Sequence, residues 1–282
     1  MIHVDLTGKT AAVTGGSGAL CGEFCKALAR AGARVAVIGS RRETAEKVTA
    51  EILAEGGQAM AVACNVLDPD SVAAAEGRIY EAYGPCHILI NGAGAAPANA
   101  CTTRERASLD ILDVPPEQEN TLFNLSSEAV SGVFGLNCMG IFNVTKVFAR
   151  RMAGVEGACI LNVTSMSGIA PLTKQVAYSA SKAAVSNLTQ WLATYLADVG
   201  IRVNAIAPGF FATKINRHLL FREDGSYTER SQKIVSGTPM GRFGEPEELV
   251  GAMLYLCDSS ASGFVTGVVL PVDGGFSAYC GV

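Results

Sequence analysis

Short apolar runs alternate with helical segments through the first third of this chain. The apolar runs and the helical segments between them are Lys9–Val13, Ala19–Ala31, Arg34–Ile38, Arg42–Glu55, Ala59–Cys64, Pro69–Tyr83 and His87–Asn91. Each run is apolar along its whole length, which is typical of parallel strands covered by helices on both faces. The alternation predicts the α/β class, with a doubly wound parallel sheet of the Rossmann type whose ligands lie across the carboxyl ends of the strands.

Two irregular segments interrupt this pattern later in the chain. The stretch from Ala95 to about Ser126 is rich in proline and charge, which indicates an insertion that overhangs the site. Residues 210–240 are polar with little periodicity, and a segment of that length favours a lid or binding loop over a plain linker. The remaining predicted elements are the helices Ser127–Met152, Ala177–Ala197 and Glu247–Cys257 and the strands Ala158–Val163, Ile201–Ile206 and Phe264–Val272. With no repeat or linker visible, we expect one NAD(P)-binding domain over residues 1–282, with a lid insertion at about 210–240.

Composition argues against several classes of function. The 282 residues carry a net charge of −4 and no basic stripe, which argues against binding to nucleic acid. No apolar run approaches the roughly 20 residues that span a bilayer, and Met1–Asp5 lacks the basic start and apolar core of a signal peptide. Nine cysteines without a Cys-x-x-Cys pair, and three scattered histidines, predict free thiols and no metal site. We therefore expect a cytoplasmic protein without nucleic-acid or membrane partners.

A glycine-rich turn, Thr14-Gly15-Gly16-Ser17-Gly18, joins the first predicted strand to the first predicted helix. Glycines let backbone amides approach a pyrophosphate closely, and the helix N-terminus adds partial positive charge. Alone the turn is a modest signal, because many tight turns between strands and helices use glycine. Its position between a strand and a helix, with a second strand following, predicts a dinucleotide held by Gly15, Ser17, Gly18, Ala19 and Leu20.

The end of the second predicted strand, Gly39-Ser40-Arg41-Arg42, carries no acid. A site that prefers NAD is expected to have an acid there for the hydroxyls of the adenosine ribose. Ser40 and Arg41 could instead hold a 2′-phosphate through charge-assisted hydrogen bonds, so we expect NADP(H) to be preferred over NAD(H). The alternative is a solvated helix N-terminus with two exposed arginines.

Ser165, Tyr178 and Lys182 bring together the groups of a proton-transfer site. Ser165 follows the end of a predicted strand, while Tyr178 and Lys182 lie one turn apart on one face of the next helix. A cation beside a phenol favours the phenolate and lowers the pKa of the phenol, which suits acid–base catalysis. A Tyr-x-x-x-Lys pair alone is more often an ordinary surface pair.

The motifs as a set decide between these two interpretations. The glycine turn and the set of Ser165, Tyr178 and Lys182 occur together with Asn91-Gly92-Ala93-Gly94, Asn137 and Pro208-Gly209. In residue type and spacing, these motifs resemble the short-chain dehydrogenase/reductase family over nearly the whole chain. The resemblance implies that Tyr178 is the general acid in carbonyl reduction and the general base in alcohol oxidation. It implies that Lys182 holds the nicotinamide ribose and lowers the pKa of Tyr178. Ser165 would bind the substrate oxygen, and Asn137 would anchor a water in a proton relay.

The resemblance also implies the remaining cofactor contacts. They are Asn65, Val66, Asn91, Gly92, Ala93, Gly94, Tyr178, Lys182, Pro208, Gly209, Phe211 and Thr213. The chain departs from the family pattern in the glycine turn, where Ala19 and Cys21 stand at positions that are usually glycine. It departs again at Asn65, where an acid is common. Neither departure touches the chemical step.

Segments toward the C-terminus resemble one branch of that family, the D-mannonate oxidoreductases (fructuronate reductases). They include Gln190–Ala193, Ala207–Phe211, Thr238–Gly244 and Val272–Tyr279. The branch interconverts a keto-uronate and an aldonate, and Lys174, Lys214, Arg217 or Arg222 either pairs with the substrate carboxylate or is simply solvated. The expected substrate contacts are Ala95, Ser167, Lys174, Asn216 and Arg217. Ala95-Ala96, where the branch tends to carry Gly-Asn, leaves room for a different, less hydroxylated substrate.

The expected function is an NAD(P)-dependent oxidoreductase that transfers hydride between nicotinamide and a keto or hydroxyl group of a sugar acid. One alternative is a reductase of another carbonyl, such as a different keto sugar acid, a polyol or a 3-oxoacyl thioester. Another is a nucleotide-binding protein without catalysis, against which the intact set of Asn137, Ser165, Tyr178 and Lys182 argues. Family resemblance and the apolar last strand favour a homotetramer.

Overall fold

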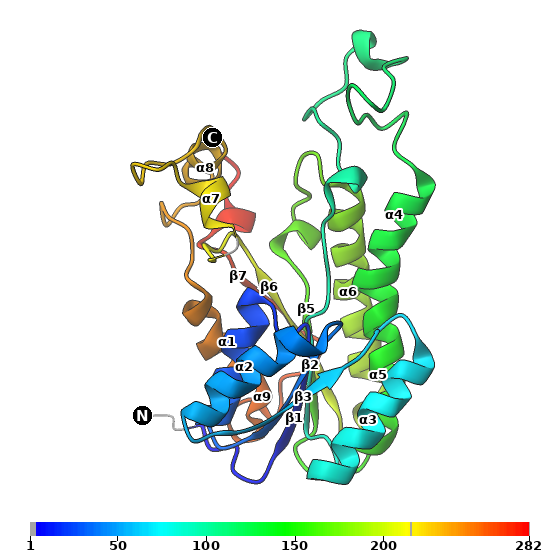
Figure 1. Ribbon diagram of the computed structural model, residues 1–282, viewed down its shortest axis with the longest axis vertical. Coiled ribbons are helices and arrows are strands. Elements are labelled where there is room, and N and C mark those ends of the chain that lie inside the picture. Colours follow the sequence, from blue (N-terminus) through cyan, green and yellow to red (C-terminus); the bar gives the residue numbers. More distant parts are fainter. Residues whose placement is uncertain (1–3, 215, 282) are drawn as a thin grey trace.

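Seven parallel strands form the centre of the molecule, whose computed structural model describes residues 4–214 and 216–281. The strands are β1 (Thr10–Thr14), β2 (Arg34–Gly39), β3 (Gln58–Ala63), β4 (Ile88–Asn91), β5 (Cys159–Val163), β6 (Arg202–Pro208) and β7 (Val269–Val272). They lie in the order β3-β2-β1-β4-β5-β6-β7 (Figure 1), so the chain builds outward from β1 in one direction and then crosses back to β4. The carboxyl ends of β1 and β4 therefore open a crevice at the point where the order reverses. The predicted α/β, doubly wound class is confirmed.

Helices cover both faces of this sheet (Figure 1). One layer contains α1 (Ala19–Arg30), α2 (Arg42–Ala54) and α9 (Val250–Cys257), and α1 packs against both of the others. The other layer contains α3 (Pro69–Tyr83), α5 (Gly140–Met152) and α6 (Val176–Tyr195), with α3 packed on α5. The sheet is thus buried between helices, which explains why its central strands are apolar throughout.

Alternate residues of each strand serve the two layers. Val13 of β1 and Ile90 of β4 belong to the core on the α1 side, whereas their neighbours Ala12 and Leu89 belong to the core on the α5 side. All four side chains are inaccessible to solvent. A slip of one residue in the register would exchange the two sets, so the two cores together fix how the strands pair.

The predicted helix Ser127–Met152 forms over its whole predicted span, but its middle is wider than an α-helix. α4 (Ser127–Phe134) runs into a π-helical turn over Gly135–Met139, and α5 continues from Gly140. A π turn is costly in an ordinary helix and is often retained at functional sites. Asn137 lies at the centre of this one.

By composition alone this helix resembles a membrane span. Ser127–Met152 is long and apolar enough to cross a membrane by length and composition only, although polar residues interrupt every apolar run in it. Its apolar side faces protein, because Val144, Phe148 and Met152 are buried in the core beside α3 and β4. It is a core helix of the domain.

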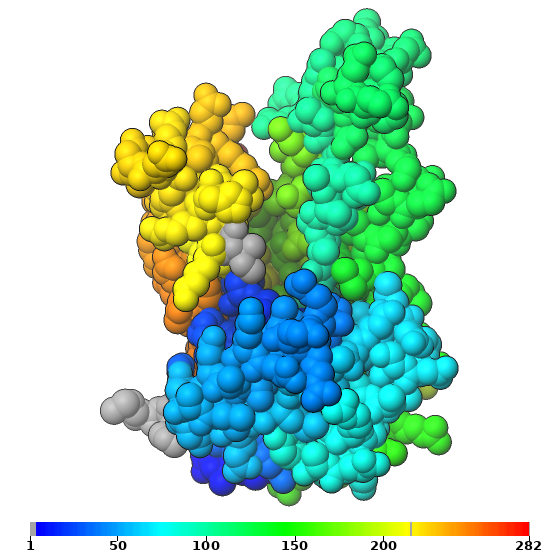
Figure 2. All heavy atoms as spheres, in the orientation of Figure 1, coloured from blue at the N-terminus to red at the C-terminus, as the bar shows by residue number. Residues whose placement is uncertain are grey.

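Two segments rise beyond the carboxyl ends of the strands and face each other across a groove (Figures 1 and 2). The arm, residues 95–126, contains short 3₁₀ turns at Ala98–Ala100 and Leu109–Ile111. The lid segment, residues 210–240, contains α7 (Arg217–Leu220) and α8 (Glu229–Ser236). Lys233 Nζ of α8 lies 3.3 Å from Glu105 Oε1 of the arm, so an ion pair links the two.

The C-terminal part departs from prediction in detail. A 3₁₀ turn over Pro246–Leu249 precedes α9, and α10 (Ser259–Ser262) follows it. β7 begins at Val269 rather than Phe264, because Gly267 turns the chain with a φ of 79°. The remaining 3₁₀ turns are Met166–Gly168, Ala197–Val199 and Phe276–Ala278.

Candidate active site

A cleft of about 360 Å³ lies at the carboxyl ends of β4, β5 and β6. Figure 2 shows the groove that leads to this end of the sheet, between the arm and the lid segment. Five separate parts of the chain line the cleft: Leu20; Gly92 and Gly94–Ala96; Val163–Met166; Leu172, Gln175, Tyr178 and Lys182; and Pro208–Phe210. The predicted residues Ser165, Tyr178 and Lys182 therefore meet at one cavity. The ends of β4 and β6, where cofactor contacts are predicted, line the same cavity.

Ser165 is held in a fixed orientation at the end of β5. Its Oγ accepts hydrogen bonds from the backbone N–H of Ser167 at 3.2 Å and from the Ser167 hydroxyl at 3.0 Å. The Ser165 side chain also lies close enough to Tyr178 to influence the pKa of its phenol. Ser167, expected as a substrate contact, is buried and holds Ser165 through these two hydrogen bonds.

Lys182 carries its ammonium group into the interior. The residue is 4% exposed, its Nζ donates to the Val163 carbonyl at 2.8 Å, and it lies 5.6 Å from the centre of the Tyr178 ring. Burial lowers the pKa of Lys182 to about 8, and the nearby Cys21 opposes that shift slightly. Burial also raises the pKa of the Cys21 thiol to about 12, so that thiol stays neutral.

The pKa of Tyr178 shifts in the direction opposite to the one expected. Burial raises it, and the hydrogen bond with Ser165 opposes the rise. The sequence analysis expects Lys182 to lower this pKa, but the ammonium group lies over the ring and binds the Val163 carbonyl. Removal of the phenolate from water therefore dominates.

Asn137 joins the π turn to the loop after β4. Its Oδ1 accepts from the Ala95 N–H at 2.8 Å, while its Nδ2 donates to the Ala95 carbonyl at 3.1 Å and to Ser181 Oγ at 3.0 Å. A Cβ on Gly94 would lie 3.0 Å from Asn137 Oδ1 and 3.5 Å from Lys182 Nζ, so these three residues meet closely. The side chain thus anchors the loop that carries Ala95 into the cleft.

The glycine turn fits the cofactor that the sequence predicts. Gly15 has a φ of 66°, and a Cβ there would lie 2.7 Å from the Gly92 carbonyl oxygen, so glycine is required. Gly18 begins α1 without a side-chain cap, which leaves the first amides of a 12-residue helix open to an anion. Leu20 reaches the cleft itself.

The adenosine end of the predicted site is open and polar. Ser40 and Arg41 are exposed directly after β2, and Ser17 Oγ accepts a hydrogen bond of 3.3 Å from Thr44 beside them. At the end of β3, Asn65 Oδ1 accepts from the Leu67 N–H at 3.1 Å, and Val66 is buried.

A second cavity of about 250 Å³ adjoins the cleft and shares Leu20, Gly209 and Phe210 with it. Its other lining residues are Phe211, Thr213, Asn216, Leu219, Leu220, Arg230, Ile234 and Phe243. The Asn216 side chain accepts from the Thr213 N–H at 2.7 Å and donates to the Phe211 carbonyl at 3.0 Å. Asn216 therefore lines this cavity, but both polar atoms of its side chain form hydrogen bonds within its own loop.

Two predicted substrate contacts, Lys174 and Arg217, lie outside both cavities. Lys174 is exposed with a φ of 70°, lines neither cavity, and meets the arm through its carbonyl, which accepts from the Thr102 N–H at 2.9 Å. Arg217 is exposed and its guanidinium lies 4.7 Å from the centre of the Phe221 ring, outside both cavities. Charge in the local sequence indicated these residues, but the fold turns them outward.

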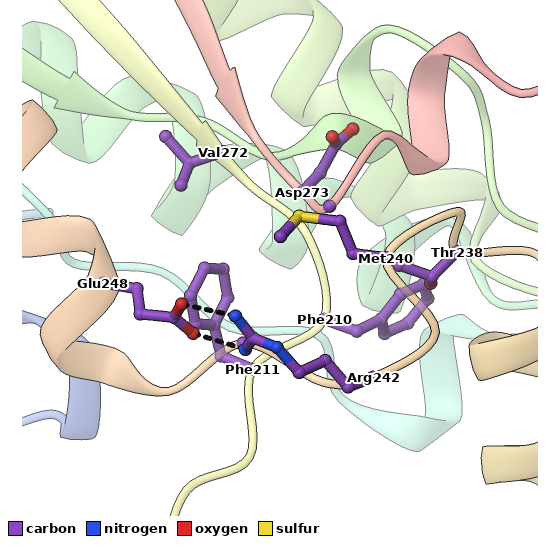
Figure 3. Close-up of a pocket in the computed structure, with 10 residues that line it drawn as sticks. Phe210, Phe211, Thr238, Met240, Arg242, Glu248, Val272 and Asp273 are labelled. Carbon is purple, nitrogen blue, oxygen red and sulfur yellow. Dashed lines mark hydrogen bonds and ion pairs between the residues drawn. The ribbon is translucent and has the colours of Figure 1, made fainter.

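A third, small cavity of about 80 Å³ lies on the other side of Phe210 and Phe211 (Figure 3). Arg242 at its rim donates to Glu248 Oε2 at 2.7 Å and Oε1 at 2.6 Å, the two dashed contacts in Figure 3. Arg242 lowers the pKa of Glu248 to about 2. Both charges are satisfied by each other, so neither is free to bind a ligand.

Comparison with known proteins identifies the family of this chain. A family model described as "Enoyl-(Acyl carrier protein) reductase" matches residues 19–277. The "Uncharacterized oxidoreductase UxuB" of Bacillus subtilis (strain 168) is 45% identical over 285 residues, which cover 100% of this chain and 99% of that protein. The chain belongs to the short-chain dehydrogenase/reductase family. Short-chain dehydrogenases are oxidoreductases that use a nicotinamide cofactor.

Two further members of the short-chain dehydrogenase/reductase family bear on the substrate. A crystal structure from Haemophilus influenza of a "putative D-Mannonate oxidoreductase", with bound NAD, is 47% identical, with a TM-score of 0.93 and coverage of 99% of this chain and 98% of that one. The "Gluconate 5-dehydrogenase" of Gluconobacter oxydans (strain 621H) is 34% identical and covers 98% of this chain and 99% of that protein. The predicted family and its likeness to the D-mannonate oxidoreductase branch are confirmed.

Sequence reasoning missed several residues of this short-chain dehydrogenase cleft. Gln175 lies three residues before Tyr178 and seven before Lys182, so helical spacing could have placed it on the same face. Phe210 lies between the predicted contacts Gly209 and Phe211, so its position in the sequence could have indicated it as well. Arg230 and Phe243 carry no such signal, because tertiary contacts alone bring them to the second cavity.

Proposed function

We propose that this protein is a nicotinamide-dependent dehydrogenase that interconverts a keto group and a hydroxyl group of a sugar acid of the D-fructuronate/D-mannonate type. The observation that carries the proposal is the convergence of Ser165, Tyr178 and Lys182 on one cleft beside the glycine turn. Residues 1–282 then act as a single domain, with residues 210–240 as the lid over its substrate.

The residues of the chain handle the reacting oxygen and its proton, while a bound nicotinamide supplies or accepts the hydride. Tyr178 gives a proton to the carbonyl oxygen in reduction and takes it back in oxidation. Its raised pKa keeps the phenol protonated at neutral pH, which suits reduction. Because Ser165 Oγ already accepts two hydrogen bonds from Ser167, its own hydrogen is free to point at the substrate oxygen.

Lys182 and Asn137 are proposed to hold the cofactor and a relay water for this reaction. The ammonium group has three donors and spends one on the Val163 carbonyl, which leaves donors for a ribose hydroxyl. Asn137 fixes the loop at Ala95 and is the proposed anchor of a relay water. The other proposed cofactor contacts are those of the glycine turn, of Asn65 and Val66, of Asn91–Gly94, and of Pro208, Gly209, Phe211 and Thr213.

Two relatives favour a sugar acid as the substrate. One is the D-mannonate oxidoreductase homologue at 47% identity and the other is the gluconate dehydrogenase at 34% identity. Against a fully hydroxylated substrate stands the lining at Ala95 and Ala96, which offers methyl groups where a polar contact is usual in the branch. A reductase of another carbonyl, such as a 3-oxoacyl thioester, is therefore the second candidate.

The preferred cofactor is proposed to be NADP(H), with NAD(H) as the alternative. Ser40 and Arg41 stand exposed at the end of β2, within reach of a proposed 2′-phosphate, and none of residues 40–42 is acidic. The NAD bound in the Haemophilus relative favours the alternative. Arg41→Ala is expected to weaken NADPH more than NADH, with Arg42→Ala, whose arginine pairs with Glu46 on the helix, as the matched control. Equal losses for both cofactors would remove Arg41 from phosphate recognition.

The decisive test is a spectrophotometric assay of D-fructuronate reduction with NADPH and with NADH. A panel of other keto acids, keto sugars and a 3-oxoacyl thioester runs beside it. Turnover of fructuronate supports the proposal and ranks the cofactors. Activity elsewhere in the panel alone moves the substrate to the second candidate, and tight cofactor binding without any turnover favours a nucleotide-binding protein.

The assembly is proposed to be a homotetramer in the cytoplasm, without nucleic-acid or membrane partners and without a resident metal. Trp191 and Tyr195 of α6 stack on each other at 4.6 Å while 54% and 68% exposed, and Phe142 of α5 is 41% exposed. Large aromatic surfaces of this kind are more typical of subunit interfaces than of free surface.

A further inference from the structure

One arginine of the lid segment faces the cavities of the active site. Arg230, in the first turn of α8, lines the second cavity, which shares Leu20, Gly209 and Phe210 with the cleft of Tyr178. The shared residues make the two cavities neighbours with a common wall. Arg230 therefore lines the cavity next to the one that holds Tyr178.

The position of Arg230 is fixed by the way α8 is anchored. Thr228 begins the helix, accepts from the Ser231 N–H at 3.3 Å and donates to the Leu219 carbonyl at 3.1 Å. Ser231 is 0% and Ile234 9% exposed, so one side of α8 packs against the protein. Arg230, between these anchors, remains exposed at the rim of the cavity.

Two residues of the arm, on the opposite wall of the groove, lie close to α8. Burial raises the pKa of the Cys101 thiol at the base of the arm, and the charge of Arg230 opposes that rise. Lys233, three residues further along α8, meets Glu105 of the arm at 3.3 Å. Because residues three apart lie near one helix face, Arg230 lines its cavity close to the entrance between the lid segment and the arm.

Arg230 is a cation with its charge still available. In residues 4–214 and 216–281 it has no acidic partner, whereas Arg242 on the other side of Phe210 is held by Glu248. Its neighbours in the cavity include Leu220, Ile234 and Phe243, which are apolar and buried. An anion bound there would meet the guanidinium against a wall of low polarity, which strengthens their attraction.

We propose that Arg230 binds the carboxylate of the substrate and so selects sugar acids over neutral sugars and polyols, an inference that rests on the proposed function. With the reacting oxygen at Ser165 and Tyr178, the substrate chain extends past Phe210 to Arg230. The planar guanidinium matches a carboxylate with two parallel hydrogen bonds. Arg230 is in this way a specificity-determining residue, and it replaces Lys174 and Arg217 as the site of acid recognition.

The test compares matched acid and neutral substrates in the full-length protein. The ratio of kcat/KM for D-mannonate oxidation to that for D-mannitol oxidation is measured in the wild type, Arg230→Met and Arg230→Lys. Arg230→Met is expected to lower the ratio roughly tenfold to hundredfold through a higher KM for the acid, and Arg230→Lys to retain part of it. Arg78→Met, an exposed arginine of α3, is the control and leaves the ratio unchanged.

Two further measurements separate the possible failures. The Kd of NADH, measured by fluorescence titration, stays the same in Arg230→Met; a weaker Kd would show that Arg230 binds the cofactor and overturn the proposal. Equal losses for mannonate and mannitol would overturn it as well. If the wild type turns over neither, calorimetry of D-mannonate with the NADH-loaded protein decides. Binding that Arg230→Met abolishes supports Arg230, while no binding by the wild type contradicts both the proposed function and this inference.

Discussion

The ammonium group of Lys182 lies where its charge is penalised. Water is excluded from it, and the Val163 carbonyl is the hydrogen-bond partner that compensates. The lowered pKa of Lys182, about 8, expresses this penalty. Residues that serve chemistry often carry such a cost, because a site built for a reaction is not a site built for stability.

Replacement of this lysine should therefore stabilise the fold. Since the pKa of Lys182 falls from 10.5 to about 8 on folding, the full penalty, at most roughly 3 kcal/mol, applies below about pH 8 and fades as pH rises toward 10.5. Lys182→Met keeps the shape of the side chain without the charge. We expect its free energy of unfolding at pH 7 to exceed that of the wild type by about 1–2 kcal/mol, while turnover is lost.

Chemical denaturation at pH 7 and pH 10 measures this difference. The gap between Lys182→Met and the wild type should shrink at the higher pH, because the wild-type lysine is then neutral in the folded protein. A gap that is constant with pH would mean that packing, rather than charge, causes the change.

Tyr178→Phe tests the proton transfer itself. The phenyl ring keeps the packing but has no proton to give, so kcat should fall by about 10²- to 10⁴-fold with little change in the Kd of NADPH. Tyr195→Phe, an exposed tyrosine at the end of the same helix, is the control. Stopped-flow single turnovers report the chemical step directly, and wild-type rates in Tyr178→Phe would remove this residue from the mechanism.

At the scale of the element, the π turn over Gly135–Met139 is what delivers Asn137 to the loop after β4. Three hydrogen bonds from one buried amide hold the backbone of Ala95 and the hydroxyl of Ser181. The turn and the loop are thus one structural unit, although more than forty residues of irregular chain and helix separate them in the sequence.

Asn137→Ala should damage this unit. The Ala95 N–H and carbonyl would lose their partners, at a cost of about 2–4 kcal/mol in unfolding free energy, and activity would fall with the loss of loop order. Asn143→Ala on α5 is the matched control, because its amide makes one hydrogen bond, to the Val66 carbonyl at 3.1 Å. Thermal unfolding and the kcat of both variants check the prediction. Equal losses of stability and kcat in the two variants would show that Asn137 is no more important than Asn143.

The sequence predicted elements well where local pattern decides them. The buried strands are apolar throughout, so β1, β2 and β4 were placed to within a residue, and α3 was placed at both ends. It could not show that Gly267 delays β7 to Val269, because an apolar run looks the same on either side of that turn. Nor could it show that Lys174 and Arg217 lie outside the cavities while Arg230 lines one, because that depends on tertiary packing.

At the scale of the whole molecule, the exposed aromatic pair on α6 offers a way to test assembly. Light scattering should give a mass four times the 29.2 kDa of one chain. Trp191→Glu places a charge in the proposed interface and should produce smaller species, whereas Glu81→Gln on the exposed side of α3 should not. A wild-type monomer at micromolar concentration would contradict the homotetramer.

The groove above the cleft is spanned at one point by the ion pair of Glu105 and Lys233, which in the described ranges is the single hydrogen bond or ion pair between the arm and the lid segment. A solvent-exposed pair of this kind contributes about 0–1 kcal/mol, which is close to thermal energy, and dissolved salt weakens it further. Ionic strength is therefore expected to act on the link between the arm and the lid segment. The same ions screen the attraction that draws an anion toward the groove, so an anionic substrate is expected to associate more slowly as salt rises.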